Sequence, residues 1–165
     1  DDDPDKDQIH EAIRNFLGLD QSALRAVDED VFKYYTDCNE YWSPGDDEYL
    51  VIASPSDVWA HVRLGTDACV TRRTSGDKGV YISLECECEW EIEHGLQIVF
   101  KDGLRINKVG SFDDHVTNAD AYGDPRLEDV VYVGQDVDVV SSAPSPPFGD
   151  GEALPKRRKP WWRFW

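Results

Sequence analysis

The first part of the chain carries hydrophobic residues at the spacing of amphipathic helices. In residues 7–17, side chains three and four positions apart fall on one helical face: Ile9, Ala12, Ile13, Phe16 and Leu17. Asp7 is placed to cap this helix and Gly18 to end it. A second region, about 21–42, repeats the spacing until the turn-forming residues 43–47. The pattern predicts N-terminal helices.

From residue 48 hydrophobic residues alternate with polar ones, which is typical of β-strands. The segments predicted as strands are 48–54, 57–65, 68–73, 80–93 (resuming after Gly95 at 96–100), 105–110 and 129–134. Asp102 and Gly103 are the strongest short signal for a hairpin. Residues 111–128 are polar and predict a loop. We therefore expect an α+β fold, in which N-terminal helices pack on a mainly antiparallel β-sheet of about five to seven strands.

The alternation is clearest in residues 80–93. The even positions are hydrophobic: Val80, Ile82, Leu84, Cys86, Cys88, Trp90 and Ile92. The odd positions are Tyr81, Ser83, Glu85, Glu87, Glu89, Glu91 and Glu93. Because successive strand residues face opposite sides of a sheet, we expect the even side chains to be buried and the glutamates to be exposed. Basic residues on adjacent strands would relieve the repulsion between the glutamates. The candidates are Arg63, Arg72, Arg73, Lys101, Arg105 and Lys108.

The same segment allows other chemistry. Carboxylates along a flat strand do not converge on one point as loop ligands do, so we expect no metal and no cofactor there. The alternative is a metalloprotein or enzyme that uses His94 with Cys86 and Cys88, although Cys-x-Cys is a weaker signal than paired Cys-x-x-Cys motifs. The chain has no nucleophile elbow, P-loop or His-Glu-x-x-His motif. We interpret His94 and Gly95 as residues that shape a bend or bulge, with the imidazole bonded to a backbone group.

Charge divides the 165 residues into an acidic body and a basic end. The formal net charge is −17, from 17 basic and 34 acidic residues. The last ten residues hold five of the basic residues, so residues 1–155, with the other 12 and all the acids, carry −22. This charge excludes direct nucleic-acid binding by the body, because such binding requires neutralisation of phosphates. It suits a basic protein partner, or serves solubility alone.

Composition also suggests the organisation of the chain. We predict a single α+β domain at 1–140, a Pro/Gly/Ser-rich linker at 141–155 and a basic, Trp-rich C-terminal tail at 156–165. No run of about 18 hydrophobic residues predicts a membrane helix, and the acidic first residues do not resemble a signal peptide. Four cysteines are too sparse for a disulfide scaffold of this length. We expect a soluble, cytoplasmic protein.

Residues 88–124 resemble a bacterial domain family of unknown function. Its recurring feature is a Trp-Glu-x-Glu-His-Gly-Leu segment followed by an Asp-Gly hairpin, and the matching residues are Trp90, Glu91, Glu93, His94, Gly95, Leu96, Asp102 and Gly103. Residues 54–65 are similar to the stretch that precedes this segment, so the likeness covers about 28–132. The resemblance implies no established activity. Some members lie near polymorphic toxin systems, where small acidic proteins serve as immunity factors.

These observations favour a non-enzymatic protein-binding module and, in a narrower form, an immunity-like inhibitor of a basic toxin. The candidate binding residues are Glu91, Glu93 and His94, with Trp161, Trp162, Arg163 and Trp165 in the tail. Trp and Arg are favoured anchors at protein interfaces. The tail has three candidate docking sites: the body of its own chain, a partner protein, or an anionic membrane surface. The charge contrast favours the first.

Overall fold

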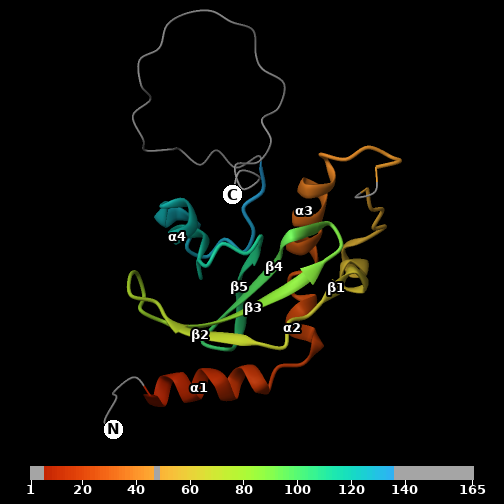
Figure 1. Cartoon of the computed structure of the whole chain (residues 1–165). Coiled ribbons are helices and arrows are strands. Elements are labelled where there is room, and N and C mark those ends of the chain that lie inside the picture. Colours follow the sequence, from red (N-terminus) through yellow and green to blue (C-terminus); the bar gives the residue numbers. More distant parts are fainter. Residues whose placement is uncertain (1–5, 47–48, 136–165) are drawn as a thin grey trace, which may run out of the picture.

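The computed structural model of the chain describes residues 6–46 and 49–135. Within these residues the fold begins with three helices, α1 (Lys6–Leu17), α2 (Gln21–Arg25) and α3 (Asp28–Asn39) (Figure 1). α1 begins before Asp7, so this residue lies in its first turn and not at the cap. The second region with helical spacing, about 21–42, forms two helices, α2 and α3, and α3 ends at Asn39. The helical prediction for this part of the chain is otherwise confirmed.

The strands form one antiparallel sheet in which β3 (Val80–Cys88) has neighbours on both edges. β4 (Glu91–Lys101) pairs with one edge, and β5 (Arg105–Gly110) pairs with the far side of β4. The other edge of β3 is shared by β1 (Val62–Arg63) and β2 (Ala68–Arg72), which pair with its two ends. The predicted α+β fold is therefore confirmed, with five strands in the described part of the chain.

The N-terminal helices cover one face of this sheet. Phe16 of α1 packs edge-on against Phe100 of β4, with ring centroids 5.1 Å apart. Tyr34 and Tyr35 of α3 both contact the indole of Trp90, at 6.1 and 5.9 Å. The even side chains of β3 complete this core, so the hydrophobic positions of this strand lie where the alternation predicts.

Residues 131–135 pack against α3, where the Tyr132 hydroxyl donates to Asp37 (2.8 Å), whereas residues 111–130 cover part of the opposite face. They contain two short helices, α4 (Asn118–Tyr122) and η2 (Pro125–Leu127), which the prediction of a loop missed (Figure 1). The predicted strand 129–134 does not form. Its contact with β5 is the hydrogen bond from the backbone N of Val109 to the carbonyl of Val131 (2.9 Å).

Two further predicted strands are wrong. Residues 49–54 have no regular structure, and Pro55–His61 form a 3₁₀ helix, η1, so that only Val62–Arg63 of segment 57–65 are extended. The sequence does contain a helix-start signal, because Pro55 occupies the first helical position after Ser54. In the structure, the Ser54 hydroxyl donates to Asp57 (2.6 Å). The packing of η1 against α3, where Trp59 Nε1 donates to Asp28, overrides the apparent alternation.

The largest departure lies at Glu89 and Trp90, where the chain reverses direction between β3 and β4. The segment predicted as one strand over 80–93 is thus a hairpin. Burial of the even positions is confirmed through Trp90, but Ile92 is 80% exposed because it lies between the pairs Cys88–Glu91 and Cys86–Leu96, where β4 does not pair with β3. Tyr81 was expected on the exposed face and is buried at the end of β3 that residues 111–135 help to cover.

A bulge in β4 follows the reversal. The pairs Cys88–Glu91 and Cys86–Leu96 enclose one residue of β3 but four residues of β4, 92–95. Gly95 has a φ of +62°, and a Cβ built on it would lie 2.3 Å from the carbonyl oxygen of Cys86. The hydroxyl of Tyr34 donates to the Gly95 carbonyl (2.9 Å), which ties the bulge to α3. The predicted bulge at His94 and Gly95 is confirmed.

A second irregularity lies on the other edge of β3. Residues 64–67 connect β1 to β2 opposite only two residues of β3, because Arg63 pairs with Glu87 and Ala68 with Leu84. A Cβ on Gly65 would lie 2.0 Å from the carbonyl oxygen of Glu85. Both extra segments therefore approach β3 at a glycine, where no side chain keeps the backbones apart.

We predict that Gly95→Ala destabilises the fold by about 1–3 kcal/mol more than Gly123→Ala. Gly123 is a matched control, because its φ is +66° but no atom lies within 4 Å of an added Cβ. The difference therefore reports the contact with Cys86 and not the backbone conformation. Urea unfolding followed by tryptophan fluorescence measures it. Equal losses in the two variants would show that the close approach contributes nothing.

Candidate functional site

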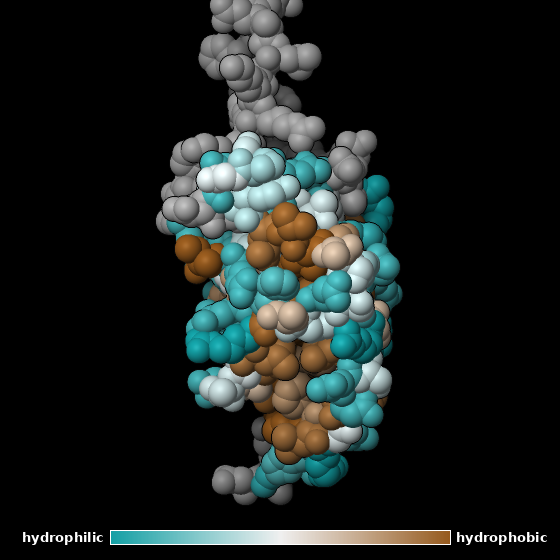
Figure 2. Space-filling view, turned by 90° about the vertical axis from the view of Figure 1, so that its right-hand side faces the viewer, coloured by the Kyte–Doolittle hydropathy of each residue, from teal (hydrophilic) through white to brown (hydrophobic). Residues whose placement is uncertain are grey.

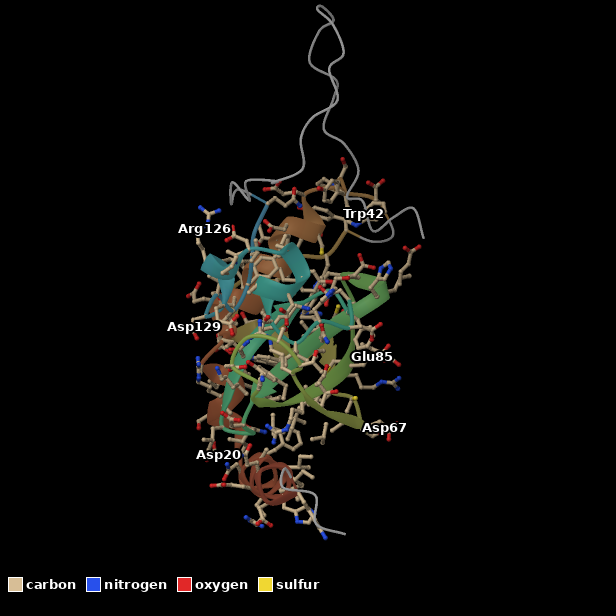
Figure 3. The ribbon with its side chains drawn as sticks, turned by 90° about the vertical axis from the view of Figure 1, so that its left-hand side faces the viewer. Asp20, Trp42, Asp67, Glu85, Arg126 and Asp129 are labelled. Atoms are coloured by element: carbon tan, nitrogen blue, oxygen red, sulfur yellow. The ribbon has the colours of Figure 1, made fainter. Side chains whose placement is uncertain are left out.

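A groove of about 940 Å³ opens on the uncovered part of the sheet. Residues 60–67 line one side and residues 91–95 the other, with the end of β3, residues 85–89, between them. The two glycine-containing segments thus form its walls. Figure 3 shows Asp67 and Glu85 on one side of the molecule, opposite Arg126 and Asp129. We call this surface the acidic groove.

Six carboxylates line the acidic groove against one guanidinium, that of Arg63. Arg63 pairs with Glu87, and His61 Nδ1 lies 2.8 Å from Glu89 Oε2. No ion pair joins Glu85 or Glu93 to a residue that the structure describes. The Arg63–Glu87 pair is exposed on both sides and contributes little to stability. The groove therefore keeps an excess of negative charge.

The other basic residues expected to face the glutamates pair elsewhere. Arg73 binds Asp120 and Glu128, Lys101 binds Asp77, Arg105 binds Asp129, and Lys108 binds Asp113. Arg72 donates to the carbonyl of Lys78 and to the side chain of Gln8. Within the described residues, Arg63 is the candidate seen to pair with one of these glutamates, Glu87, because β1 runs beside that end of β3.

The β4 bulge brings together the three candidate binding residues of the body. Glu91 Oε1 accepts hydrogen bonds from the backbone N–H groups of Glu93 (3.1 Å) and His94 (3.4 Å). One ligand atom from each of Glu91, Glu93 and His94 lies within 4.8 Å of the other two. The Nδ1 atom of His94 is buried without a hydrogen-bond partner in the described structure, so the expected bond to a backbone group finds no support there.

Hydrophobic side chains lie at the walls of the acidic groove. Ile92 is exposed at the bulge, and Leu64 is 44% exposed on the opposite wall. Figure 2 shows hydrophobic surface on the side of the molecule that carries β1 and the hairpin tip, in patches separated by hydrophilic side chains. The sequence analysis missed both residues, because it placed Ile92 on the buried face and treated Leu64 as part of a strand.

The thiols of the alternative site lie on the other face of the sheet. Cys86 and Cys88 are buried in the core, and burial raises the pKa of Cys88 to about 12. Burial likewise raises the pKa of Cys86. Cys88 Sγ donates to the carbonyl of Glu91 at 3.5 Å. Both side chains are therefore neutral thiols, whereas a metal ligand or nucleophile needs the thiolate, and neither joins the cluster at His94.

Two buried cations that were expected to face the glutamates of residues 85–93 instead join the sheet to residues 111–135. Lys108 Nζ donates to Asp113 (2.5 Å) and to Gln97 (2.7 Å), and burial lowers the pKa of this lysine. Arg73 donates to both oxygens of Asp120, and hydrogen bonds to Asp120 and Glu128 raise its pKa. Both cations donate to acceptors within the fold, so we assign them a structural role.

The remaining candidate residues, Trp161, Trp162, Arg163 and Trp165, lie outside the described residues, as does the predicted linker. No helix in the described ranges has the length and hydrophobicity needed to cross a membrane.

Fold and site together define a small α+β domain with an acidic surface groove. Residues 1–116 match a family model described as a domain of unknown function (DUF6985), and the chain belongs to this family. The match agrees with the resemblance to a domain family of unknown function. Among curated proteins and solved structures, none matches the chain. The family model ends before α4, so most of the segment that covers the polar face lies beyond the matched residues.

The ion pairs beside the sheet predict an acid-sensitive fold. Burial alone would raise the pKa of Asp77, but hydrogen bonds from Lys101, the backbone of Gly79 and Tyr81 outweigh it and lower the pKa to about 2. An ordinary Asp has a pKa of about 3.9. Because the folded pKa is the lower one, Asp77 stabilises the fold above about pH 4 and loses this contribution as the pH falls to about 2.

Asp77→Asn should therefore destabilise the protein at neutral pH and reduce its loss of stability between about pH 5 and pH 2.5. Urea unfolding at several pH values measures both effects. Asp129→Asn is the control, because this exposed carboxylate pairs with Arg105 at the surface (3.2 Å). A wild-type pH dependence in the Asp77 variant would contradict the assignment.

Proposed function

We propose that this protein is a non-enzymatic bacterial protein-binding module, and that its acidic groove binds a basic segment of a partner protein. The observation that carries the proposal is Ile92, a hydrophobic side chain that is 80% exposed between the carboxylates of Glu91 and Glu93. A hydrophobic anchor surrounded by charge is the usual arrangement of a binding hot spot.

The backbone that presents Ile92 is held by the fold. Glu91 accepts two N–H groups of the bulge, and Tyr34 donates to the Gly95 carbonyl at its far end. A preorganised segment loses less conformational entropy on binding than a free loop does. This supports a role in recognition for a side chain that adds nothing to the core.

The charge of the groove supports a basic partner. Glu85 and Glu93 have no ion-pair partner in the described structure, so a Lys or Arg of another protein would meet them without displacing an internal cation. The negative charge of the body would also accelerate encounter with a basic protein, and added salt would slow it.

The narrower form of the proposal is an immunity-like inhibitor of a basic toxin. The acidic body and the family resemblance support it, since such an inhibitor would cover a cationic surface of its target. The competing proposal, an enzyme or metalloprotein built on His94 with Cys86 and Cys88, is less well supported because both thiols are buried in the core.

Ile92→Asp should abolish partner binding without loss of stability, because Ile92 contributes little to the core. Basic proteins captured from a bacterial lysate are purified, and their association with each variant is measured by surface plasmon resonance. Leu104→Asp is the matched control, since Leu104 is 60% exposed in the turn between β4 and β5. If both variants lose partner binding equally, or if neither variant loses it, the acidic groove is not the binding surface.

The tail is a second candidate occupant of the acidic groove. Residues 156–165 carry +5 with three tryptophans, and the 20 residues between Gln135 and Lys156 can span about 66 Å when extended. We propose that the tail docks there in cis, and a partner protein or an anionic membrane surface is the alternative site. A labelled peptide of residues 156–165 should bind the chain truncated after residue 155, more weakly in high salt and with Ile92→Asp.

Full-length protein should bind this peptide more weakly than the truncated chain does, because its own tail competes. Equal binding by the two would contradict docking in cis. If the peptide binds anionic vesicles but neither protein, the result would favour an anionic membrane surface as the docking site of the tail.

A further inference from the structure

Three side chains of two kinds converge at the β4 bulge: the carboxylates of Glu91 and Glu93 and the imidazole of His94. On a flat strand, the first two would point to one side and His94 to the other. The four residues inserted opposite Glu87 break that alternation, and Gly95 allows the chain to turn back toward β3. The convergence therefore arises from the bulge, which the sequence analysis did not connect with metal binding.

Glu91 is held in place before any ligand arrives. Its side chain is only 14% exposed, and its Oε1 atom accepts the N–H groups of Glu93 and His94. A carboxylate that is oriented by backbone hydrogen bonds keeps further lone pairs for a cation. Glu93 is exposed and lies on the side of the acidic groove, so an ion would have access from solvent.

An independent observation comes from the imidazole. The Nδ1 atom of His94 is buried and has no hydrogen-bond partner among the described residues. The Glu91 Oε1 atom lies 3.7 Å from it, which is too far for a hydrogen bond. A buried nitrogen without a partner is unfavourable, and a cation placed between the imidazole and the two carboxylates would supply one.

We propose that Glu91, Glu93 and His94 bind one divalent transition-metal cation, for which Zn²⁺ is the probe. Imidazole nitrogen and carboxylate oxygen are both ordinary zinc ligands, and three protein ligands leave a position open to water or to a partner. A purely carboxylate site would suit Ca²⁺ or Mg²⁺ instead. The bound ion would offset the repulsion of the two glutamates and cross-link the segment that carries Ile92.

The test uses the full chain, stripped of metal with a chelator and titrated with Zn²⁺ in a calorimeter. We expect one ion per chain, and at least about a tenfold loss of affinity in Glu93→Gln and in His94→Ala. Glu85→Gln is the matched control, because it removes a carboxylate of the same groove outside the cluster and should bind as the wild type does. Circular dichroism confirms that each variant is folded, and Glu93, being exposed, is the variant least affected in folding.

Co²⁺ provides a second measurement. Its visible absorption reports nitrogen ligation, so the spectrum of the wild type should change in His94→Ala. Absence of saturable binding, as expected if the imidazole simply lies beside Glu91 without binding a metal, would overturn the proposal. Equal affinity in the wild type and Glu93→Gln would also overturn it, since the ion would then bind elsewhere on the acidic surface. No partner is present in these measurements, so the outcome is separate from that of partner binding.

Discussion

The close approach of the Gly95 backbone to the carbonyl of Cys86 is the constraint on which the rest of the hairpin depends. It allows four residues of β4 to lie opposite one residue of β3, and Tyr34 fixes the far end of that bulge from α3. The positions of Glu91, Ile92 and His94 all follow from it. Gly65 makes the equivalent approach on the other edge of β3, and the acidic groove lies between the two.

The two faces of the sheet are stabilised by different interactions. One face buries hydrophobic side chains under α1 and α3, which supplies the main driving force for folding. The other face is polar, and residues 111–130 cover part of it through paired and hydrogen-bonded cations, Arg73 and Lys108. These cations pair with acids of the covering segment, so that in the described structure Glu87 of β3 pairs with Arg63 and Glu85 has no ion-pair partner. The uncovered part of this face is therefore acidic because the available positive charge is used elsewhere.

Hydrophobic and charged groups meet at one place on this surface. Ile92 and Leu64 lie on opposite walls of a groove whose other groups are mostly carboxylates. Hydrophobic contact supplies affinity and charge supplies encounter rate and specificity, so the combination suits recognition of a basic partner. The family to which the chain belongs has no assigned function, and the acidic groove gives that family a surface whose role can be measured.

The sequence by itself determined the α+β class, the N-terminal helices, the Asp102–Gly103 hairpin, the burial of the even positions from Val80 to Trp90 and the bulge at Gly95. These features depend on the local periodicity of hydrophobic residues and on glycine conformation, both of which are read from neighbouring positions. The reversal at Glu89 and Trp90 could not be predicted, because neither is a typical turn residue and the alternation continues through them. The 3₁₀ helix η1 and the cover of the polar face were missed because contacts between distant residues outweigh local preference. Only the tertiary structure decided that Glu91, Glu93 and His94 converge and that Ile92 faces solvent, since the bulge interrupts the strand alternation at residues 92–95 before it resumes with Leu96 and Ile98 in the core.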